Sequence, residues 1–340
     1  MTPAVSVLLT VYNRAQLVGE AIRSILDQTY QDLELIVVDD GSTDHSLNVV
    51  RSFDDPRIRI VAQRANRGIP ATRNNALDHA RGRYIAWLDS DDVARPTRIA
   101  EQLDFLEAHP EVAMAGSCAG KIDREGRRLS GVRLVPFASE DIAAWHLFTS
   151  AFQQSSLLGR ADVLQRYRYR ADFPVCEDLE LTARIIREHP TANIARVLVD
   201  RRLHAEQSVE TFKPKIADKK RRLLAPMLQE LGVGFTSEDI ERHIELGLIK
   251  VPTQLPARDY LDWAEDWIGR LLAANAQSHL YAPGALRFAS AYFWVRACRR
   301  AMRTDRPAGL QRLMQARSTR ALFGKCGRRW LAQAAAVSAR

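Results

Sequence analysis

Short apolar runs alternate with stretches of helical periodicity over the first hundred residues of the chain. Four runs have the length and residue types of buried strands, and they cover residues 5–11, 33–38, 58–62 and 84–88. Between them, apolar residues recur at helical spacing, as they do over residues 17–26 and 70–80. This order predicts an α/β fold with a mostly parallel sheet flanked by helices, because consecutive parallel strands need a helical crossover.

Polar residues follow three of these predicted strands where each strand ends. They are residues 10–13, then Asp39 and Asp40, then the sequence Asp-Ser-Asp-Asp at residues 89–92. In open parallel sheets, ligands bind at the carboxyl ends of the strands. Carboxylates this closely spaced repel one another unless a cation joins them, most simply a divalent cation that also holds a diphosphate. A solvated acidic loop is the alternative that this stretch alone leaves open.

The second half of the chain changes character. Short strands are predicted at residues 112–115, 154–158 and 194–199, with a helix that opens at Glu177 and ends before Pro190. After residue 211 only helical patterns remain, and Thr236 begins a capping box. We therefore expect an α/β domain over residues 1–210 and a helical, Arg-rich region over residues 211–340.

The net charge of +8 is concentrated at the C-terminal end. From Arg287 onward, twelve Arg and one Lys face the single acid Asp305, so that the preceding chain carries a net charge of about −4. Apolar residues lie among these arginines, namely Leu286, Phe288, Phe293, Trp294 and Val295. This pattern is consistent with an amphipathic helix on an anionic membrane surface, which is one of two equally supported interpretations. The alternative is that these apolar residues pack on the catalytic domain.

The sequence carries no segment that is expected to cross a membrane or to direct secretion. No run approaches the roughly 18 apolar residues of a transmembrane helix, and the apolar N-terminus lacks a basic leader. The four cysteines are widely spaced, which is typical of reduced thiols. We expect a cytoplasmic protein that at most contacts the inner face of the membrane.

Two phosphate-binding signatures are missing from the sequence. No G-x-G-x-x-G follows the first predicted strand, which disfavours a dinucleotide-dependent oxidoreductase, and no G-x-x-x-x-G-K-[ST] loop is present. Any phosphate would therefore be held by a metal ion and arginine instead of a glycine-rich loop.

Taken together, the marked residues resemble family 2 glycosyltransferases of the GT-A fold over roughly the first two thirds of the chain. The resemblance is carried by residues 5–13, 37–44, 66–74 and 89–92, by Glu177-Asp178 and by His204. It implies an inverting enzyme that moves one sugar from a nucleotide donor, most simply a UDP-sugar, to a hydroxyl. The acceptor would be a glycan or lipid-linked saccharide of cell-surface polysaccharide synthesis.

The resemblance also implies roles for the donor-binding residues. Asp39 would contact the nucleotide base, with Thr10 and Tyr12 beside it and Asp40 next in the chain. Arg73 would face the nucleotide and its diphosphate. A guanidinium suits that role because its planar fork pairs with two phosphate oxygens.

Metal and catalytic roles follow from the same resemblance. Asp91 would bind Mg²⁺ or Mn²⁺ directly, Asp89 would contact ribose or a metal-bound water, and His204 would contact metal or phosphate. Asp178 would be the general base, with Glu177 as the second candidate or an orienting neighbour. Two lesser interpretations of Asp92 remain, that it pairs with Arg95 or that it caps the next helix.

Two other functions stay open on the sequence alone. A sugar-phosphate nucleotidyltransferase can share the sheet and the paired acids, but residues 10–14 lack the phosphate loop rich in glycine and lysine that such enzymes use. A non-catalytic protein that binds through its basic tail is the other. The tail contains no recognisable nucleic-acid module, so we expect no nucleic-acid partner.

Overall fold

The computed structural model describes residues 2–204, 213–248, 255–315 and 317–338. It divides into two compact units. The α/β unit comprises residues 1–137, 152–212 and 336–340, and the helical unit comprises residues 138–151 and 213–335. The expected domain boundary after residue 210 lies outside the described residues.

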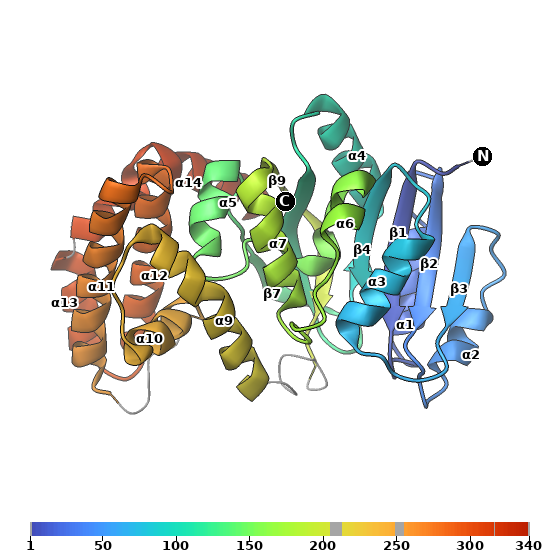
Figure 1. The fold of residues 1–340 in the computed structure, drawn as a ribbon, viewed down its shortest axis with the longest axis horizontal. Helices are drawn as coiled ribbons and strands as arrows, with labels where there is room; N and C mark the ends of the chain where they lie inside the picture. The colour runs from blue at the N-terminus through green and yellow to red at the C-terminus, as the bar shows by residue number, and fades with distance from the viewer. Residues whose placement is uncertain (1, 205–212, 249–254, 316, 339–340) are drawn as a thin grey trace. The chain divides into compact units, whose positions relative to one another are not determined.

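One mixed sheet forms the centre of the α/β unit (Figure 1). Its strand order is β3 (Ile58–Ala62), β2 (Leu33–Asp39), β1 (Val5–Val11), β4 (Tyr84–Asp89), β8 (Leu158–Arg160), β6 (Met114–Ile122), β9 (Thr191–Arg202) and β5 (Val93–Ala94), with β7 (Arg128–Arg133) paired to β6. The strands from β3 to β4 run parallel to one another. β8 is antiparallel to both of its neighbours, whereas β6 and β9 are parallel.

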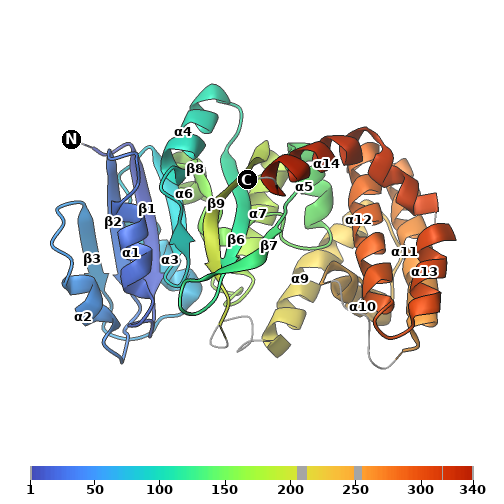
Figure 2. The same cartoon turned by 180° about the vertical axis from the view of Figure 1, so that it is seen from behind.

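Helices cover both faces of this sheet. They are α1 (Val18–Leu26), α2 (Ser46–Arg51), α3 (Ile69–His79), α4 (Arg98–Ala108), α6 (Ala161–Tyr167) and α7 (Glu177–Glu188). Figures 1 and 2 show α3 on one face and α1 on the other. Val18, Ile22 and Ile25 form a buried stripe of α1 in the same core as Val7 and Leu9 of β1. This confirms the predicted α/β fold class.

Residues 154–158 do not form the strand predicted from the sequence. Gln154–Ser156 is a short 3-10 helix, η1, and the strand β8 begins only at Leu158. The Ser156 amide donates to the Gln153 carbonyl at 2.9 Å, which tightens the chain here. So short an apolar segment carries too little periodicity to separate a strand from a turn.

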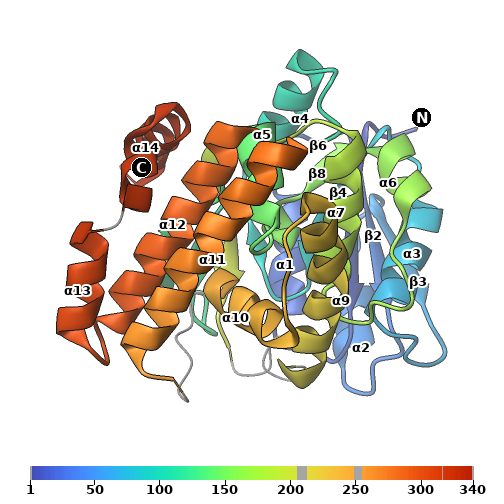
Figure 3. The same ribbon diagram turned by 60° about the vertical axis from the view of Figure 1, so that its left-hand side comes forward.

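The helical unit contains α5 (Ser139–His146), α9 (Lys213–Leu231), α10 (Ser237–Gly247), α11 (Ala257–Ser278), α12 (Pro283–Ala301), α13 (Arg306–Gln315), the 3-10 helix η2 (Arg317–Phe323) and most of α14 (Lys325–Ser338). Figure 3 shows α11 and α12 side by side. The predicted capping box at Thr236 is confirmed. Its hydroxyl accepts from the Asp239 amide at 3.1 Å, and the Asp239 carboxylate accepts from the Thr236 amide at 2.9 Å.

The apolar residues of α12 are core residues of the helical unit. Leu286, Phe288, Phe293 and Trp294 are each no more than 1% exposed. The ring centroid of Phe293 lies 4.9 Å from that of Trp145 and 4.8 Å from that of Phe148. Val295 is partly buried, and contact with lipid, one of the two interpretations that the sequence left open, is therefore wrong for the other four residues. They pack inside the protein, and no helix in the described ranges is long and apolar enough to cross a bilayer.

Candidate functional site

Strand register places the predicted donor-binding residues at one edge of the sheet. Thr10 of β1 is paired with Asp89 of β4, and its neighbour Val11 is paired with Asp39 of β2. Thr10 is half-buried, and Tyr12 just beyond the strand is 42% exposed. The carboxyl ends of the three central strands therefore meet, as expected for a parallel sheet.

Asp39 has one oxygen fixed by the protein and one without a partner. Its Oδ2 accepts from the Ser42 amide at 3.0 Å. Asn13 holds this turn in place, because its backbone amide donates to Ser42 Oγ at 3.0 Å and its side-chain Oδ1 accepts from the Thr43 backbone amide at 2.8 Å. Asp39 Oδ1 is buried and has no hydrogen-bond partner in the described part of the chain. Since buried acceptors are normally satisfied, this oxygen is suited to an N–H group of a ligand.

Asp40 fixes the loop that leads into α3. Its oxygens accept from Gln63 Nε2 at 3.0 Å, from the Arg67 amide at 2.7 Å and from the Gly68 amide at 3.1 Å. The preceding turn packs tightly on the same loop, because a Cβ at Gly41 (φ +68°) would lie 2.5 Å from the backbone of Ala65. The contact of Asp40 with a donor stays a prediction, since the structure shows both of its oxygens bound by the Gln63 side chain and by two backbone amides.

Arg73 of α3 is buried between two acids and two aromatic rings. Its Nη2 lies 3.0 Å from Asp89 Oδ1 and its Nη1 lies 3.0 Å from Glu177 Oε1. The guanidinium stacks over Trp87 and Tyr169 at 5.6 and 5.4 Å from the ring centroids. Burial by itself lowers the pKa of Arg73, but the carboxylates of Glu177 and Asp89 raise it above its ordinary value. Arg73 therefore stays charged and joins the end of β4 to the start of α7.

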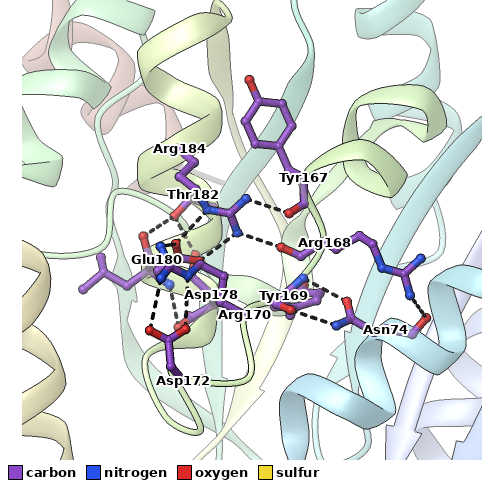
Figure 4. A network of polar contacts seen from close by, with 11 residues as sticks. Asn74, Tyr167, Arg168, Tyr169, Arg170, Asp172, Asp178, Glu180, Thr182 and Arg184 are labelled. Carbon is purple, nitrogen blue, oxygen red and sulfur yellow. Dashed lines mark hydrogen bonds and ion pairs between the residues drawn. The ribbon is translucent and has the colours of Figure 1, made fainter.

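The loop before α7 is clamped by side chains from two helices (Figure 4). Asn74 donates to the Tyr169 carbonyl and accepts from the Tyr169 amide, both at 2.8 Å. Arg184 donates to the carbonyls of Tyr167 and Arg168 at 2.6 and 2.7 Å, and pairs with both oxygens of Glu180. These contacts fix the backbone of Tyr169, and so they determine where its ring meets Arg73.

The acidic loop after β4 is bound by the end of β9. His204 Nε2 lies 2.9 Å from Asp91 Oδ2. Arg202 donates through its side chain to the Asp91 carbonyl at 2.8 Å and through its amide to Asp92 Oδ1 at 2.9 Å. Burial alone raises the pKa of Asp91, but the His204 hydrogen bond and the nearby charges of His204 and Arg14 hold it below its ordinary value. Asp91 is therefore kept ionised.

Ser155 of η1 connects the other two acids of this loop. Its hydroxyl lies 3.0 Å from Asp89 Oδ2 and is also hydrogen-bonded to Asp92 Oδ2. Burial, and then the charges of Asp91 and Asp89, raise the pKa of Asp92 well above its ordinary value. The expectation that Asp92 pairs with Arg95 is wrong. Arg95 is bound instead by both carboxylate oxygens of Asp200.

Asp92 does not cap the following helix either, because the N-cap residue of α4 is Thr97. Sequence reasoning missed Ser155 and Arg202. Ser155 lay inside an expected strand and so carried no signal of its own. Arg202 stands two residues before His204, and that position was the one hint in the sequence.

The two acids that open α7 differ in environment. α7 follows Cys176, whose φ of 58° turns the chain sharply into the helix. Glu177 is 6% exposed and paired with Arg73, whereas Asp178 is less buried and has no ion pair within the described residues. Asp178 Oδ1 accepts from the Leu179 amide at 2.8 Å. Asp178 is therefore the more accessible acid of this pair, and its role as general base stays a prediction.

Glu177 should make stability fall as the pH rises. Burial raises its pKa from 4.5 to about 7, an effect that Asp178 strengthens and Arg73 opposes. Between these values the folded state binds more protons than the unfolded state, so this contribution to stability is lost as the pH rises through that window. We expect Glu177→Gln to flatten the dependence of the melting temperature on pH between about 4.5 and 7.

The matched control for this prediction is Glu188→Gln, at the exposed end of the same helix. It should leave the pH dependence of the melting temperature unchanged. A Glu177→Gln profile as steep as that of the unchanged protein would contradict a raised pKa at Glu177.

The residues at this edge suit a divalent cation that is shared with a phosphate ligand. Asp91 and His204 present an oxygen and a nitrogen side by side, and Asp89 lies in the same loop. In the described ranges, no three or more His, Cys, Asp and Glu side chains form a group that could hold a metal ion. A cation at this edge would therefore take its remaining ligands from the phosphates of a bound nucleotide and from water.

Comparison with known proteins identifies the family. The model of the family described as "Glycosyl transferase family 2" matches residues 6–168. An uncharacterized glycosyltransferase of Haemophilus influenzae is 31% identical over 221 residues, which are 62% of this chain and 68% of that protein. The Escherichia coli protein named "UDP-Glc:alpha-D-GlcNAc-diphosphoundecaprenol beta-1,3-glucosyltransferase WfaP" is 39% identical over 103 residues, which are 30% of this chain and 41% of WfaP.

The fold is also shared with solved structures. S. aureus TarS residues 1–349, solved with UDP-GlcNAc, superpose with a TM-score of 0.56 at 17% identity, over 88% of this chain and 91% of that chain. At this identity the likeness concerns the fold alone, and it agrees with the GT-A fold expected from the sequence. The sheet, the acidic edge and these relatives agree, and the chain belongs to glycosyltransferase family 2.

Proposed function

We propose that this glycosyltransferase is an inverting, metal-dependent enzyme that moves one sugar from a nucleoside diphosphate donor to an acceptor hydroxyl. The observation that carries the proposal is the bridge made by Arg73. It joins Asp89, in the loop that would hold donor and metal, to Glu177, the neighbour of Asp178. One buried cation thereby joins the loop that would bind the donor to the start of the helix that carries the candidate base.

A UDP-sugar is the donor that we favour. The unpartnered Oδ1 of Asp39 would accept the N–H of a uracil ring, and Thr10 and Tyr12 lie beside it at the end of β1. TarS was solved in complex with UDP-GlcNAc, and the name of WfaP includes UDP-Glc. Both support a uridine nucleotide, although neither extends to the identity of the sugar.

Transfer would proceed by direct displacement at the anomeric carbon. Asp178 takes the proton of the acceptor hydroxyl while that oxygen bonds to the anomeric carbon, and the bond from this carbon to the diphosphate oxygen breaks. The diphosphate leaves with the electron pair. A divalent cation held by Asp91 and His204 would offset the charge that develops on it. Attack opposite the leaving group inverts the configuration at that carbon.

The acceptor that we propose is a glycan or a lipid-linked saccharide in polysaccharide synthesis. The name of WfaP describes action on a diphosphoundecaprenol-linked sugar, which supports a lipid-linked acceptor. A cytoplasmic location, at the inner face of the membrane, follows from such an acceptor and remains a proposal.

A screen of nucleotide sugars for thermal stabilisation, with and without Mg²⁺ or Mn²⁺, tests the donor assignment. A UDP-sugar with a divalent cation should stabilise the protein by about 2.7 kcal/mol at a hundred times its dissociation constant, and less without the cation. Stabilisation by nucleoside triphosphates, accompanied by pyrophosphate release, would overturn the proposal.

Asn74 should matter for catalysis although it is expected to touch neither substrate. Asn74→Ala removes both hydrogen bonds to the Tyr169 backbone and should destabilise the protein by about 1–3 kcal/mol. Because the Tyr169 ring packs on Arg73, kcat should fall by roughly tenfold, with a smaller change in KM for the donor.

The control for this prediction is a contact from the same helix, α3, to the same loop. Asp78→Asn breaks the exposed Asp78–Arg168 ion pair, which should change stability by less than about 1 kcal/mol and leave kcat unchanged. An Asn74→Ala protein with unaltered kcat would show that the position of Tyr169 is not critical.

A further inference from the structure

The last part of the helical unit is basic and lacks acids. From Arg306 to Arg340 the sequence contains seven Arg and one Lys but no Asp or Glu. Two of these arginines are engaged within the unit, since Arg312 pairs with Asp262 and Glu265 and Arg329 pairs with Asp141. Arg306, Arg320 and Lys325 are exposed and have no carboxylate partner in the described part of the chain.

The two most exposed large apolar side chains among the described residues lie in the same stretch. Met314 is 78% exposed and Phe323 is 66% exposed, and Leu310 adds a third at 46%. Isolated exposed apolar residues are normal in proteins, but these three alternate along the chain with exposed cations that have no carboxylate partner in the described residues. We call Arg306, Leu310, Met314, Arg320, Phe323 and Lys325 the terminal basic surface.

The geometry of α13 directs one face of the helix outward. Arg306, Leu310 and Met314 are spaced four residues apart, so they lie on one face. The opposite side is fixed against α12, because Ala308 is 2% exposed and a Cβ at Gly309 would lie 2.7 Å from the Cys298 carbonyl oxygen. The packing that holds the helix thus leaves its apolar and cationic stripe exposed.

We propose that the terminal basic surface binds the headgroup region of an anionic bilayer, with Met314 and Phe323 inserted among the lipids. Basic residues near such a surface attract anionic headgroups, and apolar side chains beside them enter the boundary with the acyl chains. A nucleic-acid backbone would engage the cations but would give no favourable contact to Met314 or Leu310. The residues differ from those suggested by the sequence, because the apolar side chains of α12 are buried.

This contact would serve the proposed reaction by bringing the enzyme to a lipid-linked acceptor. That consequence rests on the proposed function, whereas lipid binding itself does not. The terminal basic surface shares no residue with the donor site, so the two can be tested separately.

Cosedimentation of the full chain with vesicles tests the proposal. Phosphatidylcholine vesicles that contain phosphatidylglycerol should bind the protein, more weakly as salt rises, and pure phosphatidylcholine vesicles should not. Arg320→Gln with Lys325→Gln should weaken binding by about 25-fold, on the basis of ~1 kcal/mol for each basic residue. Met314→Ser with Phe323→Ser should also weaken it by at least about tenfold.

Matched control pairs come from the same unit. Arg287→Gln with Arg299→Gln removes the same charge from α12, and Leu248→Ser with Leu280→Ser removes exposed apolar side chains elsewhere. Both pairs should bind vesicles within about twofold of the unchanged protein, since they lie outside the terminal basic surface. Equal weakening by test and control pairs would overturn the proposal.

Three further outcomes would also overturn it. The first is binding to neutral vesicles as tight as binding to anionic vesicles, and the second is binding to RNA but not to vesicles. The third is a protein that forms a dimer and does not bind vesicles, where Met314→Ser with Phe323→Ser makes the dimer dissociate. All variants should keep the stabilisation by donor and metal, because the donor site is untouched. If the unchanged protein binds vesicles but is not stabilised by donor and metal, the proposed function is wrong and the lipid-binding proposal stands.

Discussion

Replacement of Asp178 by asparagine is expected to lower kcat for sugar transfer by about 10²–10⁴-fold while the fold is retained. Asparagine cannot take the proton from the acceptor hydroxyl. Its side-chain oxygen can still accept the hydrogen bond that the Leu179 amide donates to Asp178. The melting temperature should therefore change little. Steady-state kinetics with donor and acceptor, together with a thermal melt, would measure both effects.

Glu177→Gln is the matched comparison for Asp178→Asn. Glu177 is paired with Arg73 and buried, so its loss should disturb stability and pH dependence more than it lowers kcat. If Glu177→Gln abolishes turnover while Asp178→Asn turns over normally, the base is Glu177 and our assignment is wrong.

The second large effect is expected for Asp91→Asn. This change removes the ionised carboxylate that His204 and Arg14 stabilise. A cation bound there would contribute several kcal/mol, so affinity for UDP in the presence of Mg²⁺ or Mn²⁺ should fall by about 100-fold or more. Affinity for UDP without metal should change much less. Isothermal titration of UDP with and without the cation would measure the difference.

Asp92→Asn controls for loss of a neighbouring acid. Asp92 is buried and held by Ser155 and Arg202, and we assign it no contact with metal. This variant should melt at a lower temperature but keep the increase in UDP affinity that the cation produces. An Asp91→Asn protein with the metal dependence of the unchanged chain would exclude Asp91 as a ligand.

The first half of the fold could be predicted from the sequence because its central strands β1, β2 and β4 are buried on both faces and are therefore continuous apolar runs. β1 has the bounds predicted from the sequence, and so does β3, which is only partly buried. The meeting of Asp39 and Asp89 also followed, since parallel register brings strand ends together. Local pattern was sufficient here because each strand carries its own apolar run and the alternation with helices indicates parallel pairing.

The rest of the site depends on contacts between distant parts of the chain. His204 and Asp91 are 113 residues apart, and Ser155 and Asp89 are 66 apart. No periodicity encodes such pairings. The sequence likewise does not show that Arg73 is enclosed by Asp89, Glu177 and two aromatic rings.

The C-terminal region shows the same limit in another way. The apolar residues of α12 and the exposed Met314 and Phe323 are equally surrounded by arginines in the sequence. Only packing distinguishes them, because most apolar side chains of α12 are buried by its neighbours whereas Met314 of α13 and Phe323 of η2 are exposed.

The anomeric configuration of the first sugar released from a UDP-α-sugar tests the central claim most directly. Nuclear magnetic resonance can follow this release, with water as acceptor, before the anomers equilibrate. We expect a β product together with UDP, dependent on a divalent cation and abolished by Asp178→Asn. An α product, or release of pyrophosphate, would contradict inverting transfer at this site.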